Sequence, residues 1–468
     1  MAGSGHMYSR LAEAVKRSGT PRSVYSQDTT LSRRGLLTRA DRRARELTSA
    51  GVKAGDIVAL SMGNVAEYLI LMLATSKLGA IAMPLDPSEG DRPLYEAAER
   101  LPLRAVIRRP RGLDPASVEY PPTYDVRSRK RLTSSLLTID ALEPPASLRD
   151  LTLPAGAELI MEARGIGGVL RDTVRCGHHL EAIGHAAVAA LELDEGVRLL
   201  CAQPLTSPRY FDAVVLGWLA SEAQLVIAEG PSLLDVIPIA RTDENLVVVD
   251  SVRQFTELTR ALRASSRTLE ATPVLPQATV PLPSGRPMKQ TFGRSPRQLL
   301  SLEEVGVLAW RLMDRGHAFE PAPGVELRAG ADMEVGGQEI LVRSTQTGIT
   351  LPRIPDDEPG SPADDDGFLH TGYAGKFTKR GLVEVIGRDD GLVNLEGRRA
   401  CLDSIEDKML EHRRITWVRA YWAHTPDGDP EVHLEYRATG ETDVDDIEEH
   451  AVGHLPPFMV PRAFERLQ

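Results

Sequence analysis

Cysteine, aromatic residues and long apolar runs are all scarce in this 468-residue sequence, in which Phe, Trp and Tyr together make up 5%. The three cysteines, Cys176, Cys201 and Cys401, lack the paired spacing of zinc motifs and are too few for a disulfide scaffold. They fit a reducing cytosol. No apolar run reaches membrane-spanning length and no secretion signal is recognisable. We therefore expect a cytoplasmic protein with no membrane partner and no metal site.

Basic residues are outnumbered as well. The sequence has 55 Lys and Arg against 66 Asp and Glu, which gives a net charge of −11. A nucleic-acid partner is not expected, because phosphate backbones are bound by basic faces. The length is sufficient for a large buried core and favours two unequal domains.

The order of apolar segments predicts alternating strands and helices. Residues 56–62 have the pattern of a buried strand, residues 67–78 that of an amphipathic helix, and residues 79–85 that of a second strand. Similar segments follow, with strands expected at 104–108, 159–161, 197–202, 225–228 and 246–249 and an Ala-rich helix at 180–191. The pattern predicts an α/β fold whose large N-terminal domain, residues 1–387, contains doubly covered, mostly parallel sheets.

Two regions depart from this pattern. Residues 110–156 are rich in Pro, Ser and Arg and have no clear period, so we expect surface excursions around one short strand. After Gly387 the sequence predicts a compact α+β unit, with helices at 404–412 and 444–454 and strands at 418–423 and 431–436. We predict a small, hinged C-terminal domain over residues 388–468.

The stretch from Glu158 to Leu180, ELIMEARGIGGVLRDTVRCGHHL, has the outline of a phosphate-binding loop. A strand end is followed by a turn containing Gly165 and Gly168, then by Arg171 and by a helix expected to start near His178. Glycines let backbone amides approach an anion, but residues 159–172 contain no hydroxyl side chain and an acid follows the base. The loop therefore holds no nucleotide, or holds one poorly.

Longer segments resemble the adenylate-forming ligase superfamily, which includes acyl- and aryl-CoA synthetases, peptide-synthetase adenylation domains and luciferases. The similar segments are KLGAIAMPLDP at 77–87, PAPGVELRAGADMEVGGQEILVRS at 321–344, DDDGFLHTGYAGKFTKRGLVEVIGRDDGLV at 364–393 and LPPFMVPR at 455–462. The resemblance covers nearly the whole sequence. It implies a large domain joined to a small one by a hinge.

The resemblance is weaker in the phosphate loop. Residues that lack the family's hydroxyls stand at its Ser/Thr positions, namely Ala163, Arg164, Ile166 and Gly167. The loop lysine corresponds to Arg171, and the next glycine corresponds to Asp172, which repels phosphate. We expect Arg171 to pair with Asp172 or Glu162 rather than with a phosphate.

Other positions of the resemblance also differ. In SLEEVG, Glu304 matches the family's magnesium-linked carboxylate, while Glu303 replaces its threonine. Tyr373 stands where the family places the aspartate that binds the ribose. Arg388 and Asp390 match the hinge on which the small domain rotates. The sequence ends at Gln468, before the position of the family's lysine that stabilises the developing adenylate.

Together these departures predict that ATP and magnesium are not used efficiently, since losing one preorganised donor typically costs about 10²–10³ in rate. Our first hypothesis is an ATP-independent acyltransferase, which moves an acyl group between CoA and an acyl carrier protein or amine in a biosynthetic pathway. Its substrate would be a coenzyme A or phosphopantetheine thioester. A non-catalytic scaffold that binds an acyl thioester or carrier protein is the second hypothesis, and a divergent acyl-CoA or acyl-carrier ligase is the third.

Candidate reacting groups are few. Cys201, at the end of a predicted strand, and Cys176, just past the loop, are candidate nucleophiles, and His178 and His179 are candidate bases. Each has a simpler interpretation: an apolar-strand cysteine is commonly a core residue, and a His pair that opens a helix commonly caps it. Two interpretations of Glu304 stay open: it is a remnant carboxylate satisfied by a neighbour, or it retains a role in charge stabilisation. The acyl group and the oligomeric state cannot be read from the sequence.

Overall fold

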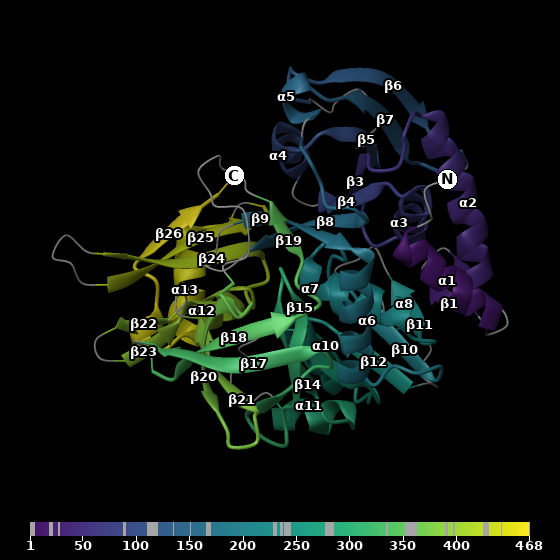
Figure 1. The fold of residues 1–468 in the computed structure, drawn as a ribbon. Helices are drawn as coiled ribbons and strands as arrows, with labels where there is room; N and C mark the ends of the chain where they lie inside the picture. Colours follow the sequence, from purple (N-terminus) through teal and green to yellow (C-terminus); the bar gives the residue numbers. More distant parts are fainter. Residues whose placement is uncertain are drawn as a thin grey trace.

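The computed structural model describes most of the chain, namely residues 5–17, 22–26, 29–87, 90–109, 120–133, 135–149, 151–164, 170–227, 232–234, 237, 245–276, 285–333, 336–351, 363–388, 392–395, 398–424, 430–440 and 442–467. Two large sheets, two smaller sheets and their covering helices form the fold of the described residues (Figure 1). This α/β architecture confirms the predicted fold class.

The first large sheet has eight strands in the order β19-β9-β8-β4-β3-β5-β7-β6. Their bounds are β3 (Ile57–Ser61), β4 (Ile81–Leu85), β5 (Leu103–Arg108), β6 (Asp125–Arg131), β7 (Thr138–Glu143), β8 (Ala157–Arg164), β9 (Leu170–Cys176) and β19 (Ile349–Leu351). The central strands β8, β4, β3 and β5 are parallel, as predicted, but both edges are antiparallel.

The second large sheet has thirteen strands in the order β17-β18-β20-β21-β16-β15-β14-β13-β12-β10-β11-β1-β2. Their bounds are β1 (Arg22–Tyr25), β2 (Thr30–Ser32), β10 (Val197–Cys201), β11 (Gln224–Ile227), β12 (Asn245–Val249), β13 (Thr272–Leu275), β14 (Arg297–Leu302), β15 (Gly306–Leu312), β16 (Ala318–Pro321), β17 (Val325–Asp332), β18 (Gln338–Ser344), β20 (Leu369–Phe377) and β21 (Val383–Arg388). Strands from β1 through β11, β10, β12 and β13 to β14 are parallel. The carboxyl ends of β10 and β12 therefore meet at one edge.

Helices cover these sheets. They are α1 (His6–Arg17), α2 (Arg33–Ser49), α3 (Ala66–Leu78), α4 (Arg92–Arg100), α5 (Ala146–Arg149), α6 (Gly177–Leu191), α7 (Pro208–Tyr210), the π-helix η3 (Phe211–Leu216), α8 (Gly217–Ala220), α10 (Val252–Ala264) and α11 (Gly285–Phe292). The amphipathic prediction for α3 was wrong, because the run from Tyr68 to Ser76 is buried on all sides. That burial follows from its contacts with α1 and α2 on one side and with β3 and β4 on the other.

The segment expected to be surface excursions around one short strand contains two strands, β6 and β7. They form an antiparallel hairpin at the edge of the first sheet, and β7 pairs with β5. The prediction failed because charge hides the pattern: β6 reads DVRSRKR, and Asp140 of β7 is fully buried in an ion pair with Arg129. None of the described helices is both long and apolar enough to cross a membrane.

The C-terminal elements have a core of their own (yellow in Figure 1). They comprise β22 (Leu392–Leu395), β23 (Arg398–Cys401), α12 (Leu402–Met409), β24 (Ile415–His424), β25 (Pro430–Ala438), α13 (Val444–His454), the 3₁₀ turn η4 (Pro457–Met459) and β26 (Ala463–Arg466). Ile405, Tyr436 and Ile447 are completely buried within this core. The domain boundary at Gly387 remains a prediction; β21 itself continues through Gly387 to Arg388.

Candidate functional site

The stretch that resembles a phosphate loop is a β-hairpin. Strand β8 runs to Arg164 and β9 returns from Leu170, with Glu162 opposite Asp172 and Ala157 opposite Cys176. Gly165 and Gly168 lie outside the described residues. The helix expected near His178 is confirmed as α6, but β9 was not predicted.

At the loop end of the hairpin, the acids are held by an arginine from another helix. Arg100 of α4 pairs with Glu162 at 2.8 Å and with Asp172 at 3.0 Å. Asp172 is only 2% exposed, so its charge needs this compensation. Arg171 was expected in this role, yet its side chain belongs to the opposite face of β9 from Asp172. Sequence reasoning missed Arg100 because it lies about seventy residues upstream.

A buried charge cluster joins the two large sheets. Arg175 of β9 and Asp212 of η3 form an ion pair with side chains 0% and 1% exposed. Arg175 also donates from Nη2 to the main-chain oxygen of Glu303 at 2.7 Å. Burial raises the pKa of Asp212 to about 6, even though Arg175 acts in the opposite direction. Arg175 thus links β9 to η3 through the ion pair and to the turn between β14 and β15 through the hydrogen bond.

Glu303 and Tyr373 lie around a second arginine of this cluster. The Glu303 carboxylate accepts from Arg209 of α7 at 2.9 Å. Burial alone would lower the pKa of Arg209, but the Glu303 carboxylate raises it, and Tyr373 is close enough to contribute. Tyr373 itself is 7% exposed and packs with Leu300 and other apolar residues of the second sheet. The structure therefore gathers the positions where the family places its threonine and its ribose aspartate.

Glu304 and the predicted hinge adjoin this cluster. Glu304 is 5% exposed, and its main-chain oxygen accepts from the amide of Gly348 at 2.9 Å. Arg388, the last residue of β21, lies opposite Tyr373 in the β20–β21 ladder. Asp390 lies outside the described residues. The backbone that leads into the C-terminal elements thus starts beside the position that corresponds to the family's ribose site.

Cys201 lies at the carboxyl end of β10, next to an acid that the sequence reasoning missed. Burial, with the charge of Asp250, holds the pKa of the Cys201 thiol well above its ordinary value, and the side chain is 0% exposed. Asp250 follows β12 and accepts from the Ala202 amide at 3.1 Å and from Gln203 Nε2 at 2.7 Å. Burial raises the pKa of Asp250 to about 7. The acid at the end of the apolar run LVVVD was the available sequence signal.

Tyr210 connects this edge to the C-terminal elements. Burial, with the charges of Asp250 and of Asp407 in α12, holds the pKa of the Tyr210 hydroxyl well above its ordinary value. Of these causes, burial is the largest and the charge of Asp407 is the smallest. Groups from both the large sheets and the C-terminal elements therefore meet near Tyr210.

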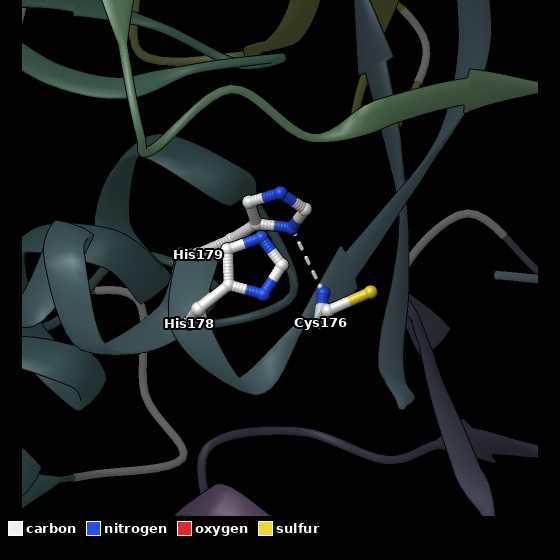
Figure 2. A group of neighbouring side chains, drawn as sticks. All are labelled: Cys176, His178 and His179. Carbon is white, nitrogen blue, oxygen red and sulfur yellow. Dashed lines mark hydrogen bonds between the residues drawn. The ribbon is translucent and has the colours of Figure 1, made fainter. Parts of the chain in front are cut away.

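Cys176, His178 and His179 lie at the other end of the hairpin. Cys176 pairs with Ala157 of β8, whereas Asp172 pairs with Glu162. These two positions of β8 are five residues apart, which at about 3.4 Å per residue is about 17 Å. Its amide donates to Nδ1 of His179 at 3.0 Å, and Figure 2 shows the sulfur directed away from both rings. Sequence proximity to the loop therefore does not bring these side chains to its end.

The pKa shifts of Cys176 and His179 favour a neutral thiol beside a neutral imidazole. Burial, with the charge of Glu158, raises the pKa of Cys176. Burial, with His178 and Arg175, lowers the pKa of His179 to about 4. A thiolate–imidazolium pair, the usual form of an activated cysteine, is not favoured by these shifts.

Comparison with known proteins agrees with the observed fold. Residues 11–147 match the model of the AMP-binding enzyme family. Novobiocin biosynthesis protein H of Streptomyces niveus is 26% identical, over 97% of this chain and 79% of that protein. The 2,3-dihydroxybenzoate-AMP ligase of Bacillus subtilis is 23% identical, over 86% of this chain and 79% of that protein. A solved point variant of E. coli MenE with bound OSB-AMS has a TM-score of 0.69 at 17% identity, over 100% of this chain and 95% of that one. The chain belongs to the adenylate-forming superfamily.

Proposed function

We propose that this protein transfers an acyl group between thioesters, or from a thioester to an amine, without consuming ATP. The observation that carries the proposal is the Arg209–Glu303 ion pair, with Tyr373 packed beside it. These residues stand where the superfamily handles a nucleotide. Here a carboxylate replaces a hydroxyl, an aromatic ring replaces a ribose-binding acid, and the arginine is already paired.

The charge balance of this region opposes a triphosphate. Arg175 faces Asp212, Arg209 faces Glu303, and Arg100 faces Glu162 and Asp172. A triphosphate needs donors whose charge is not already compensated, and each carboxylate adds repulsion. The residues present do not fit ATP with magnesium, so no step of the proposed reaction passes through either.

Thioester exchange needs no such activation. The thiol of a phosphopantetheine arm attacks the carbonyl carbon of an acyl-CoA, and the tetrahedral intermediate expels the CoA thiolate. The proton of the attacking thiol ends on CoA, so the reaction balances without a co-reactant. Positioning the two thioesters is the main requirement, and in this proposal the C-terminal elements contribute to it.

Direct exchange is preferred over an acyl-enzyme in this proposal. Both candidate nucleophiles, Cys176 and Cys201, are buried, and the pKa of each thiol is raised by burial. The same observation favours the second candidate function, a protein that binds an acyl thioester or carrier protein without reacting. The two functions differ only in whether acyl groups move.

The test combines binding with turnover. Calorimetric titration with ATP and Mg²⁺ is expected to give no heat, whereas a panel of acyl- and aryl-CoA thioesters is expected to contain a ligand. That thioester is then incubated with pantetheine and a phosphopantetheinylated carrier, and acyl transfer is followed by mass spectrometry. Transfer above the uncatalysed rate supports the acyltransferase, and binding without transfer supports the scaffold. ATP binding with acid-dependent pyrophosphate release would return the protein to the ligases and overturn both.

A further inference from the structure

We propose that Cys176, His178 and His179 form a binding site for a divalent transition metal of the zinc type. Each offers one ligand atom, and these atoms lie within 4.8 Å of one another (Figure 2). The spacing of the cysteines predicts no zinc site, because a single thiol is present here. One thiolate with two imidazoles is nevertheless a complete three-ligand set, which leaves a fourth position open.

The donor set determines the class of metal. Thiolate sulfur and imidazole nitrogen favour Zn²⁺ and Co²⁺, whereas Mg²⁺ and Ca²⁺ prefer oxygen ligands. Tetrahedral coordination with Zn–S near 2.3 Å and Zn–N near 2.0 Å separates ligand atoms by about 3.3–3.6 Å. The 4.8 Å limit is therefore about 1.2–1.5 Å wider than a bound site requires. Rotation of the Cys176 side chain, whose sulfur points away from the rings in Figure 2, is the movement that closes it.

The hydrogen bond at the start of α6 already orients one ligand. Because the Cys176 amide donates to Nδ1 of His179, Nδ1 carries the ring's lone pair and Nε2 carries its proton. The lone pair is thus directed toward Cys176, and a metal would take it in place of the amide hydrogen. Metal binding and the helix cap therefore compete for the same nitrogen.

The surroundings allow a metal to enter and leave the fourth position accessible. His178 is exposed, while Cys176 and His179 are buried. Gly177 and Glu158 line a neighbouring cavity of about 770 Å³ at the amino edge of the first sheet. The Glu158 carboxylate accepts from the Met7 amide at 3.2 Å and from Ser76 Oγ at 2.9 Å, so it is already engaged. The fourth ligand in this proposal is water from the cavity side.

The site is independent of the proposed acyl transfer, because it lies about 17 Å along β8 from the loop end. It is tested on the full chain by titration with Co²⁺. One equivalent is expected to give visible d–d bands and a thiolate-to-cobalt charge-transfer band in the near ultraviolet, both displaced by Zn²⁺. Cys176→Ser is expected to lose the charge-transfer band. His178→Ala is expected to weaken Co²⁺ affinity at least about tenfold.

Matched variants make the test decisive. Cys201→Ser removes another buried thiol and should leave the spectrum unchanged. His6→Ala should also retain it, although the His6 side chain lies near Gly177. His178 is exposed, so its replacement keeps the fold intact even where Cys176→Ser does not. No charge-transfer band in the parent chain, a band that survives Cys176→Ser, or unchanged affinity in His178→Ala overturns the proposal.

Discussion

Asp212 and Asp250 are both buried, yet they are held in opposite ways. Asp212 faces the guanidinium of Arg175, whereas Asp250 accepts from uncharged donors, the Ala202 amide and the Gln203 side chain. Burial raises the pKa of Asp212 to about 6 and that of Asp250 to about 7. The first carboxylate has its charge compensated, while the second changes charge near neutral pH. The cluster around Glu303 is thus locked by ion pairs, and the edge near Cys201 can hold or release a proton.

The largest expected effect comes from breaking the compensated pair. Arg175→Leu leaves Asp212 buried without its charge partner, which should destabilise the fold by about 3–5 kcal/mol. Urea unfolding monitored by circular dichroism measures this loss. The double variant Arg175→Leu/Asp212→Leu should recover much of it, since replacing a whole buried pair by apolar residues is often nearly neutral. Equal losses in the single and double variants would show that packing, not charge, is decisive.

The next effect is a pH dependence from Asp250. Its pKa rises from 3.8 to about 7 on folding, so the folded state binds the proton more tightly. The contribution of Asp250 to stability is therefore fully present below pH 3.8, and this contribution is lost as pH rises toward about 7. The full shift corresponds to about 4 kcal/mol. Urea midpoints measured across this pH range should fall less steeply in Asp250→Asn, and an unchanged slope would contradict the assignment.

A smaller effect is expected at the second arginine of the cluster. Arg209 is 38% exposed in its pair with Glu303, so solvent screens the interaction, and Arg209→Ala should cost less than about 1 kcal/mol. Its removal should leave ATP binding unchanged, unlike the removal of a phosphate ligand. If Arg209 served a nucleotide, its removal would weaken ATP binding. Under our proposal, calorimetry shows no ATP binding in either protein, whereas Glu303→Thr is the variant in which ATP binding could reappear.

The sequence predicts the framework because burial there follows regular periods. Helix α13 was predicted with the bounds Val444–His454 that the structure has, and the parallel centre of the first sheet follows from its apolar runs. Strand β9 could not be found in this way. Its Asp172 and Arg175 are buried, but their partners Arg100 and Asp212 come from distant elements. Buried charged residues whose partners are distant in sequence have the same sequence pattern as an exposed loop.

The residues of the candidate site were likewise predicted only in part. The resemblance singled out Glu303, Glu304 and Tyr373, and the structure brings Glu303 and Tyr373 near Arg209. Arg209 itself and Asp250 were missed, because neither belongs to a recognisable motif. Cys176 follows Asp172 closely in sequence, but the antiparallel return of β9 carries it to the other end of the hairpin. The separation of Cys176 from Asp172 follows from the direction of β9, which the periodicity of the sequence does not predict.

The smallest expected effect is on catalysis at Cys201. This thiol is fully buried beside Asp250, and burial keeps its pKa well above the ordinary value, so direct exchange between two thioester substrates does not use it. Cys201→Ser should leave the rate of acyl transfer within about twofold of the parent chain and should form no less acyl product in a single turnover. Cys176→Ser provides the matched comparison at the far end of the hairpin. A drop of about 10²-fold or more in Cys201→Ser, with an acylated parent enzyme seen by mass spectrometry, would instead assign a covalent intermediate to Cys201. Asp250 would then be the group that accepts the thiol proton. Its hydrogen bonds to uncharged donors, in place of an ion pair, would then serve catalysis.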